Sequence, residues 1–322
     1  MTIEHPVITV DRRLDTAGPC KRRINGKLNS TDIDQEFGNA FCVWHKQRGN
    51  VYSDASMSST TPAIPRIPEG TLQQLERLNE VFLQENQKLN LSAFRTQENS
   101  WIGNVLDSLA MVETGLLAPG PQNPSIPPHA EFAPTPFPSP VTGVEKNNNN
   151  EKPQLHILDL GTGGGFPLLP LALCYPQHSF VGMDATQKKI AAVERIAQEM
   201  HIPNVSLVTG RAEELGRDPK HREQYDLVLS RAVAPINVLL EYCVPFVKVG
   251  GHIVLWKSTK IEQELKDSLL SRAELSCQLE TQHEYELSEK WGKRKLVILR
   301  KRFATKEKYP REVGVPKKKP LL

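Results

Sequence analysis

Apolar residues recur at helical spacing in the part of the chain that follows residue 68. One amphipathic face is formed by Leu72, Leu75, Leu78, Val81 and Phe82, at intervals of three and four residues. Thr71 is the candidate cap at the start of this helix. A second amphipathic segment is formed by Trp101, Ile102, Val105, Leu106, Leu109 and Val112. We expect residues 69–117 to form a small helical cap.

Strand and helix patterns alternate from Gln154 onward. Seven short apolar runs are candidate strands: Leu155–Leu160, Ser179–Asp184, Val205–Thr209, Tyr225–Ser230, His252–Trp256, Gln278–Leu287 and Lys295–Arg300. Helices are expected at Gln187–Met200 and around Ile261–Leu270. Alternation of this kind predicts an α/β fold with a doubly wound, seven-stranded sheet over residues 154–303, with the last two strands as an antiparallel pair.

The remaining segments carry little periodicity. Residues 1–68 lack it, and Ser53–Pro68 is rich in Ser, Thr and Pro, which predicts a disordered N-terminal extension. Residues 118–153 contain a proline-rich stretch and the homopolymer Asn147–Asn150, which predicts a disordered insertion between cap and sheet. Residues 304–322 form a basic C-terminal tail.

A glycine-dense turn follows the first expected strand. The stretch His156–Pro167 contains G-x-G-x-G, preceded by an acid at Asp159. The dinucleotide fingerprint needs a third glycine where Phe166 stands, which argues against an NAD(P) oxidoreductase. The pattern resembles motif I of the class I S-adenosylmethionine (SAM) methyltransferases, whose cationic ligand suits a nearby carboxylate. A glycine-rich surface turn without a ligand is the alternative.

Groups suited to such a ligand follow the other strands too. Asp184 ends the second strand and can accept hydrogen bonds from two ribose hydroxyls, or it can cap the following helix. Ala212 and Glu213 follow the third strand, where methyltransferases contact adenine, although they also suit the first turn of a helix. Arg231 ends the fourth strand and is expected to line the cleft or to form a structural ion pair.

The ordered set of motifs closely resembles the RsmG/GidB family of small-subunit ribosomal RNA (guanine-N7)-methyltransferases. The resemblance covers about residues 70–117 and 154–322, and its motifs include Asn90–Ala93, Leu106–Leu109, Leu158–Pro167, Gly210–Glu214, Ser230–Pro235 and Lys308–Leu321. It implies a class I SAM-dependent, Rossmann-like methyltransferase fold. Carried over by position, the candidate SAM-binding residues are Asp159, Gly161, Gly163, Gly165, Phe166, Asp184, Ala212, Glu213 and Arg231.

Three positions depart from the family pattern. Asn104 stands where the family usually has a histidine, and Leu168 replaces a frequent glycine. Ser258 stands where Lys-Gly is usual, although Lys257 is kept. The first departure puts a direct role of that histidine in doubt.

The reaction implied by the resemblance needs no general base. Guanine N7 carries a lone pair and no proton, so alignment of the two reactants can supply the catalysis, on the order of 7–11 kcal/mol. We therefore name no catalytic residue, and only Arg231 and Lys257 as candidates for the acceptor side. The implied product is N7-methylguanine in the decoding-region loop of 16S-type rRNA.

Charge supports an RNA partner, either rRNA or a pre-ribosomal small subunit. The net charge is only +3, but twelve Lys or Arg residues against two acids follow from Lys293 to the end of the chain. Such a density is typical of a phosphate-binding surface, with a merely solvated tail as the alternative. A non-catalytic, RNA-binding ribosome-assembly factor that keeps a SAM-type fold is the alternative function.

Composition bears on membrane spans, metal sites, disulfides and the cellular compartment. No run of 18 apolar residues occurs, so we expect a soluble protein without a membrane span. The five cysteines are scattered, which predicts neither a zinc site nor disulfides. We expect a monomer in the cytoplasm or, if the asparagine run reflects a eukaryotic source, in the plastid stroma or mitochondrial matrix.

Overall fold

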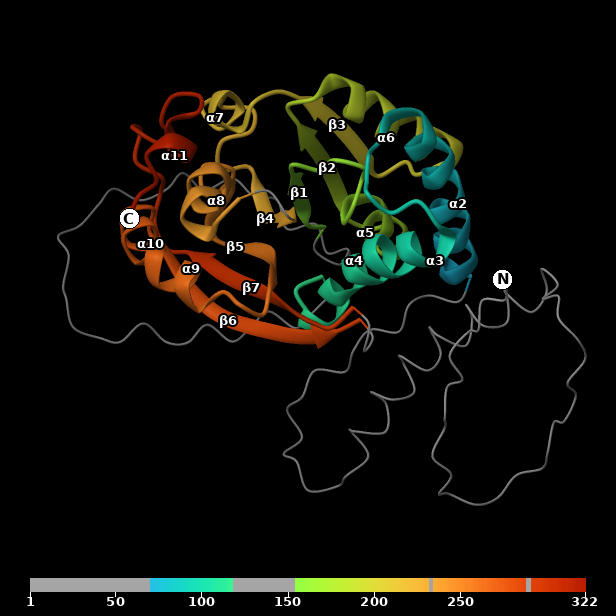
Figure 1. The fold of residues 1–322 in the computed structure, drawn as a ribbon. Coiled ribbons are helices and arrows are strands. Elements are labelled where there is room, and N and C mark those ends of the chain that lie inside the picture. Colours follow the sequence, from blue (N-terminus) through green and yellow to red (C-terminus); the bar gives the residue numbers. More distant parts are fainter. Residues whose placement is uncertain (1–69, 118–153, 232–233, 288–290) are drawn as a thin grey trace, which may run out of the picture. The chain divides into compact units, whose positions relative to one another are not determined.

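A seven-stranded sheet is the centre of the computed structural model, which describes residues 70–117, 154–231, 234–287 and 291–322 (Figure 1). The strand order is β3-β2-β1-β4-β5-β7-β6. The first five strands are parallel, and β7 runs antiparallel between β5 and β6. The strands are β1 (His156–Leu160), β2 (Ser179–Asp184), β3 (Val205–Thr209), β4 (Tyr225–Arg231), β5 (Val247–Ser258), β6 (Cys277–Glu286) and β7 (Lys293–Lys301). The predicted class I methyltransferase fold is thereby confirmed.

Helices flank this sheet and precede it. The first group is α2 (Thr71–Leu89), α3 (Gln97–Ser100), the π-helix η1 (Trp101–Leu106), α4 (Asp107–Leu109) and the 3₁₀-helix η2 (Ala110–Thr114). The helices between and after the strands are α5 (Leu168–Cys174), α6 (Gln187–Glu199), α7 (Ala212–Leu215), α8 (Ile236–Cys243), α9 (Glu262–Asp267), α10 (Leu269–Glu274) and α11 (Val315–Lys318). No helix in these ranges is both long and apolar enough to cross a bilayer. The expected N-terminal extension and Pro/Asn-rich insertion lie outside the described residues.

The strand and helix ends differ from expectation where glycine is involved. Thr71 was expected as a helix cap, but it is the first residue of α2, and Gly70 precedes it with φ 88°. β5 begins at Val247, five residues before the predicted start, because the strand already includes Gly250 and Gly251. The pairing of β5 with β4 shifts register there, as in a β-bulge, and Gly250 has φ 84°.

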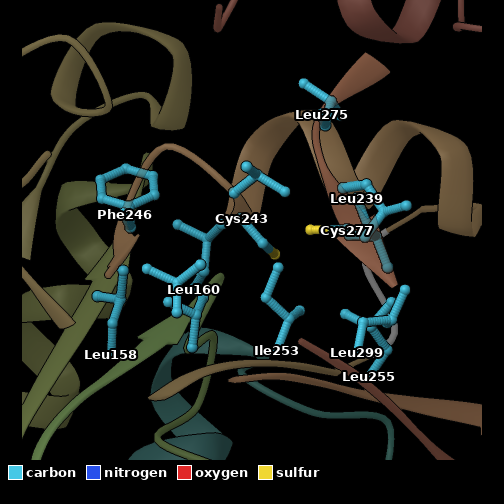
Figure 2. Packing of buried hydrophobic residues seen from close by; sticks show 14 of the residues in the cluster. Leu158, Leu160, Leu239, Cys243, Phe246, Ile253, Leu255, Leu275, Cys277 and Leu299 are labelled. Carbon is cyan, nitrogen blue, oxygen red and sulfur yellow. The ribbon is translucent and has the colours of Figure 1, made fainter. Parts of the chain in front are cut away.

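The main core lies between the sheet and α8. Alternate residues of β1, Leu158 and Leu160, belong to this cluster, as do Leu239 of α8 and Phe246 (Figure 2). Side chains of β5, β6, β7 and the end of α10 complete the cluster, including the buried free thiols of Cys243 and Cys277. Burial of apolar surface fixes α8 on the sheet, and α8 borders the carboxyl ends of β1 and β4, where the candidate site lies.

The first helical group packs on the other side of the molecule. α2 contacts α6, α5 and η1, and the ring of Phe82 meets that of Phe166 edge-on at 4.8 Å between centroids. The buried Glu85 carboxylate accepts a 2.6 Å hydrogen bond from Arg195 of α6. These contacts hold the helices against the turn that follows β1.

The basic C-terminal tail, residues 304–322, packs against the domain. Tyr309 is buried, and Arg222 donates hydrogen bonds to the carbonyls of Thr305 and Tyr309. The Arg311 guanidinium binds both oxygens of the buried Glu241 carboxylate on α8 at 2.6–3.0 Å. Its partners come from distant parts of the chain, so charge density alone could not reveal this packing.

The Arg311–Glu241 pair generates a stability prediction. Arg311→Ala leaves Glu241, whose side chain is 1% exposed, without its partner, so we expect a loss of about 3–5 kcal/mol in the free energy of unfolding. Lys308→Ala is the matched control, because Lys308 is 61% exposed and pairs with Glu274 at the surface, where a pair contributes about 0–1 kcal/mol. Urea unfolding measures both, and equal losses would contradict the buried-pair argument.

Candidate functional site

A cavity of about 500 Å³ lies at the carboxyl ends of β1, β2, β3 and β4. The strand order reverses between β1 and β4. Open α/β folds bind ligands at the carboxyl ends of the strands, next to such a reversal. Six of the nine predicted cofactor-binding residues line it: Gly161, Gly163, Asp184, Ala212, Glu213 and Arg231. The structure therefore brings together groups that are up to 70 residues apart in sequence.

The glycine turn lets the backbone form one wall of this cavity. Gly161 and Gly163 both have positive φ, 78° and 58°, a region in which residues with a Cβ are strained. A Cβ on Gly163 would meet only the Gly161 carbonyl oxygen, at 3.7 Å, so it would project into open space. Gly165 also has a positive φ, but a Cβ there would collide with Leu169 at 2.7 Å. Gly165 thus serves packing of the loop, and the other two shape the cavity.

Asp184 presents a carboxylate to the cavity in a fixed orientation. One oxygen accepts a hydrogen bond from the Gly163 N–H at 3.2 Å, and the other accepts one from the Thr186 N–H at 2.8 Å. The residue that caps α6 is Thr186, not Asp184, so Asp184 is not the helix cap considered above. Each oxygen retains capacity for a further donor.

Ala212 and Glu213 open α7, next to β3. Both line the cavity, as predicted. Glu213 is buried, and its carboxylate accepts a 2.9 Å hydrogen bond from the Gly314 N–H. Glu213 therefore ties the C-terminal segment to the cavity, which also brings Lys317 into its lining.

Arg231 combines the two roles considered for it. Its guanidinium forms a 3.1 Å ion pair with Asp107, whose side chain is 1% exposed, and donates to the Gly103 carbonyl and the Asn104 amide oxygen. It also lies over the Phe166 ring, 5.8 Å from the centroid. An arginine anchored in this way is rigid, yet it still lines the cavity.

Asp159 and Phe166 were also predicted to bind the cofactor, but neither lines the cavity. Phe166 is buried between Phe82 and the Arg231 guanidinium, so it supports Arg231 from behind. Asp159 is 1% exposed, and neither of its oxygens meets a hydrogen-bonding group in good geometry among the described residues. Burial raises the pKa of Asp159 to about 6, partly offset by the Thr162 hydroxyl and the positive charge of Arg231.

A second cavity of about 480 Å³ adjoins the first and shares Arg231 with it. Lys257, the other predicted acceptor-side residue, lies here and not in the first cavity. Its ammonium group donates to the Ala234 carbonyl and to Glu264, both at 2.7 Å. Lys257 thus fixes the wall of the second cavity through its partners.

Several residues that line the first cavity were not predicted from the sequence, among them Lys189, Tyr242 and Lys317. Lys189 lies in the first turn of α6, five residues after Asp184, and that proximity was a usable signal. Tyr242 lies on α8 and Lys317 on α11. Their positions depend on how these helices pack, which no local pattern indicates.

Similarity to known proteins identifies the family. The family model described as GidB, rRNA small subunit methyltransferase G, matches residues 140–297. The ribosomal RNA small subunit methyltransferase G of Alkaliphilus metalliredigens is 32% identical over 79% of this chain and 92% of its own length. That of Thermoanaerobacter pseudethanolicus is 33% identical over 78% and 90% of the two chains. The chain belongs to this family.

Two further matches differ in extent. The Brevibacillus brevis member is 40% identical over 52% of this chain and 70% of its own length. Among solved structures, a ribosomal protein L11 methylase from Lactobacillus delbrueckii is 17% identical, covers 47% of this chain and 72% of that chain, and has a TM-score of 0.36. Membership of the rRNA small subunit methyltransferase G family confirms the predicted family, and with it a SAM-dependent methyltransferase.

The buried Asp159 generates a prediction of pH dependence. Its pKa in the folded protein, about 6, lies above the ordinary value of 3.8, so the folded state binds this proton more tightly than the unfolded state. The resulting stability is complete below about pH 4 and is lost as the pH rises through about 6, a change on the order of 3 kcal/mol. Asp159→Asn should remove this dependence.

Urea unfolding of both proteins between about pH 4 and pH 7 measures it. We expect the variant to gain stability relative to the wild type as the pH rises. A difference between the two proteins that stays constant with pH would contradict the assignment.

Proposed function

We propose that this protein transfers a methyl group from SAM to N7 of a guanine in the decoding-region loop of small-subunit rRNA. The observation that carries the proposal is the position of Arg231, which lines both the cavity at the strand ends and the second cavity, whose other lining includes Lys257, Trp256 and Trp291. Two reactants held on either side of one fixed side chain lie next to each other. Family membership supports the reaction and the RNA class.

The first cavity fits SAM on three counts. Gly163 leaves open the space that a side chain would fill, so a ligand can approach the backbone. Asp184 keeps acceptor capacity on both oxygens, which suits the two hydroxyls of a ribose. Ala212 and Glu213 lie beyond β3, on the side where an adenine would be held. When bound, SAM supplies an electrophilic methyl group on a cationic sulfur.

The chain's own residues then hold and orient the reactants. Arg231 is fixed by Asp107, Asn104 and Gly103, so it keeps the boundary between the cavities in place. Guanine N7 has no proton to remove, and the geometry is consistent with that: Asp159, the acid nearest the glycine turn in sequence, lies outside the cavity. Catalysis rests on proximity and alignment.

We further propose that the protein acts as a monomer on rRNA or a pre-ribosomal small subunit. The compartment would be one that assembles bacterial-type ribosomes, since the curated relatives named above are bacterial. The rival reading, an assembly factor without catalysis, gains no support from the cavity, because the glycine turn, Asp184 and Arg231 are all in place.

Titration calorimetry with SAM and, separately, with NADH tests the cofactor. We expect SAM binding and no NADH signal. Transfer of a tritiated methyl group to small-subunit RNA, followed by identification of the modified nucleoside, tests the reaction. SAM binding without transfer to naked RNA or to small subunits would favour the assembly factor.

Asp184→Asn tests the cofactor site directly. The amide removes the charge and one of the two acceptor oxygens, so we expect the SAM dissociation constant to rise about 10- to 100-fold. Asp218→Asn is the matched control, because Asp218 accepts the same kind of bond, from the N–H two residues on, at 2.9 Å, and does not line the cavity. Equal SAM affinity in both variants would remove Asp184 from the site.

A further inference from the structure

The second cavity is lined by aromatic rings and by cations. Its aromatic lining is Trp256, Tyr285 and Trp291, and its basic lining is Arg231, Lys257, Lys293 and Arg294. Trp256 belongs to β5 and Tyr285 to β6, and Trp291 lies two residues before β7. The fold therefore gathers them from separate segments beside the cofactor cavity.

Two of the aromatic residues are structural. The Tyr285 hydroxyl donates a 2.6 Å hydrogen bond to the Asp107 carboxylate, and the Trp256 N–H donates a 2.8 Å bond to the Asp107 carbonyl. Both side chains are buried, at 1% and 5% exposure. Trp291 is only half-buried, and its ring meets Phe94 edge-on at 5.1 Å between centroids. Trp291 is thus the one ring of the three that is partly exposed to solvent.

Two of the four basic side chains are firmly held and two are weakly held. Lys257 and Arg231 are held by carbonyls and carboxylates at 2.7–3.2 Å. Lys293 is 60% exposed and pairs with Glu284 at 3.3 Å, and Arg294 reaches Asp107 only at 3.5 Å. Exposed or long ion pairs of this kind contribute little. These two side chains can therefore turn to a new anion at low cost.

We propose that the second cavity binds one nucleotide that is splayed out of the RNA, with its base stacked on Trp291 and its phosphates beside Lys293 and Arg294. The inference rests on the proposed function and extends it to the acceptor site. Enzymes that modify a base take it out of the stack, and aromatic faces with flanking cations are how proteins hold single-stranded bases. The shared Arg231 places the base next to the methyl donor's cavity.

The anchoring of Arg231 also protects the reactive atom. A free arginine commonly donates to guanine N7 and O6 together, which would occupy the lone pair that must attack the methyl group. Here three of the five N–H groups of Arg231 are committed, two of Nη1 to Gly103 and Asp107 and one of Nη2 to Asn104, so the paired terminal N–H groups cannot both turn to a base. The N7 lone pair of a guanine beside Arg231 can therefore stay free to attack the methyl group.

Trp291→Ala is the decisive variant. We expect KM for small subunits reconstituted with unmodified RNA to rise about 5- to 150-fold, the range for loss of one stacked base, while the SAM dissociation constant stays within about twofold. Trp291→Phe keeps an aromatic face and should recover most of the affinity. The SAM measurement also reports whether each variant is folded.

The charged residues give an independent test. Lys293→Ala should weaken RNA binding and reduce the slope of log K against log salt by about 1. Lys306→Ala is the control: Lys306 is also an exposed lysine in one surface ion pair, 53% exposed and bonded to Glu274 at 3.0 Å, but it does not line the cavity. Equal salt slopes for Lys293→Ala and the wild type would contradict the phosphate role.

An unchanged KM for RNA in Trp291→Ala would overturn the proposal, and so would a parallel loss of SAM affinity. If the wild-type protein methylates no RNA, the proposed function fails separately. Fluorescence anisotropy with a labelled, guanine-containing single-stranded RNA then still decides the inference. Equal binding by the wild type and Trp291→Ala would overturn the nucleotide pocket, and weaker binding by the variant would support it.

Discussion

The buried carboxylate of Asp107 is the interaction on which the rest of the site depends. Its side chain is 1% exposed and binds Arg231 from β4 at 3.1 Å and Tyr285 from β6 at 2.6 Å, whereas Arg294 from β7 stays at 3.5 Å. A buried charge is costly unless ion pairs and hydrogen bonds compensate it. Because Arg231 and Tyr285 come from two different strands, satisfying this carboxylate fixes the helical segment that contains Asp107 against the sheet.

The two cavities follow from this arrangement. Arg231 is drawn toward Asp107 and Asn104, and Phe166 packs under its guanidinium. That position is the wall between the cavities. Asn104 is buried and donates to Ser100 while it accepts from Arg231. At this position the chain uses a neutral amide to orient the arginine.

Local pattern was sufficient for most of the fold. Buried parallel strands are nearly continuous apolar runs, so Ser179–Asp184 was predicted with its observed ends. The edge strand Val205–Thr209 was also predicted with its observed ends, although its residues are only half-buried or exposed. The strand-end rule then located Asp184 and Arg231 at the cavity. Asp159 shows where the rule stops: neighbouring strand residues face opposite sides of the sheet, so Leu160 lines the cavity and Asp159 does not. The motif contains residues that face both sides of the sheet, whereas the cavity lies at one edge of it.

The basic residues near the C-terminus also show how far a sequence pattern can predict the site. Seven of the twelve basic residues from Lys293 onward lie within 4.0 Å of a carboxylate, and most of those acids are far away in sequence. Lys301 is wholly buried, bonded to Glu223 and to two carbonyls. A count of basic residues therefore overstates the charge available to phosphate. The charge available to phosphate depends on which cations have weak partners, and in this structure Lys293 and Arg294, which line the second cavity, are two of them.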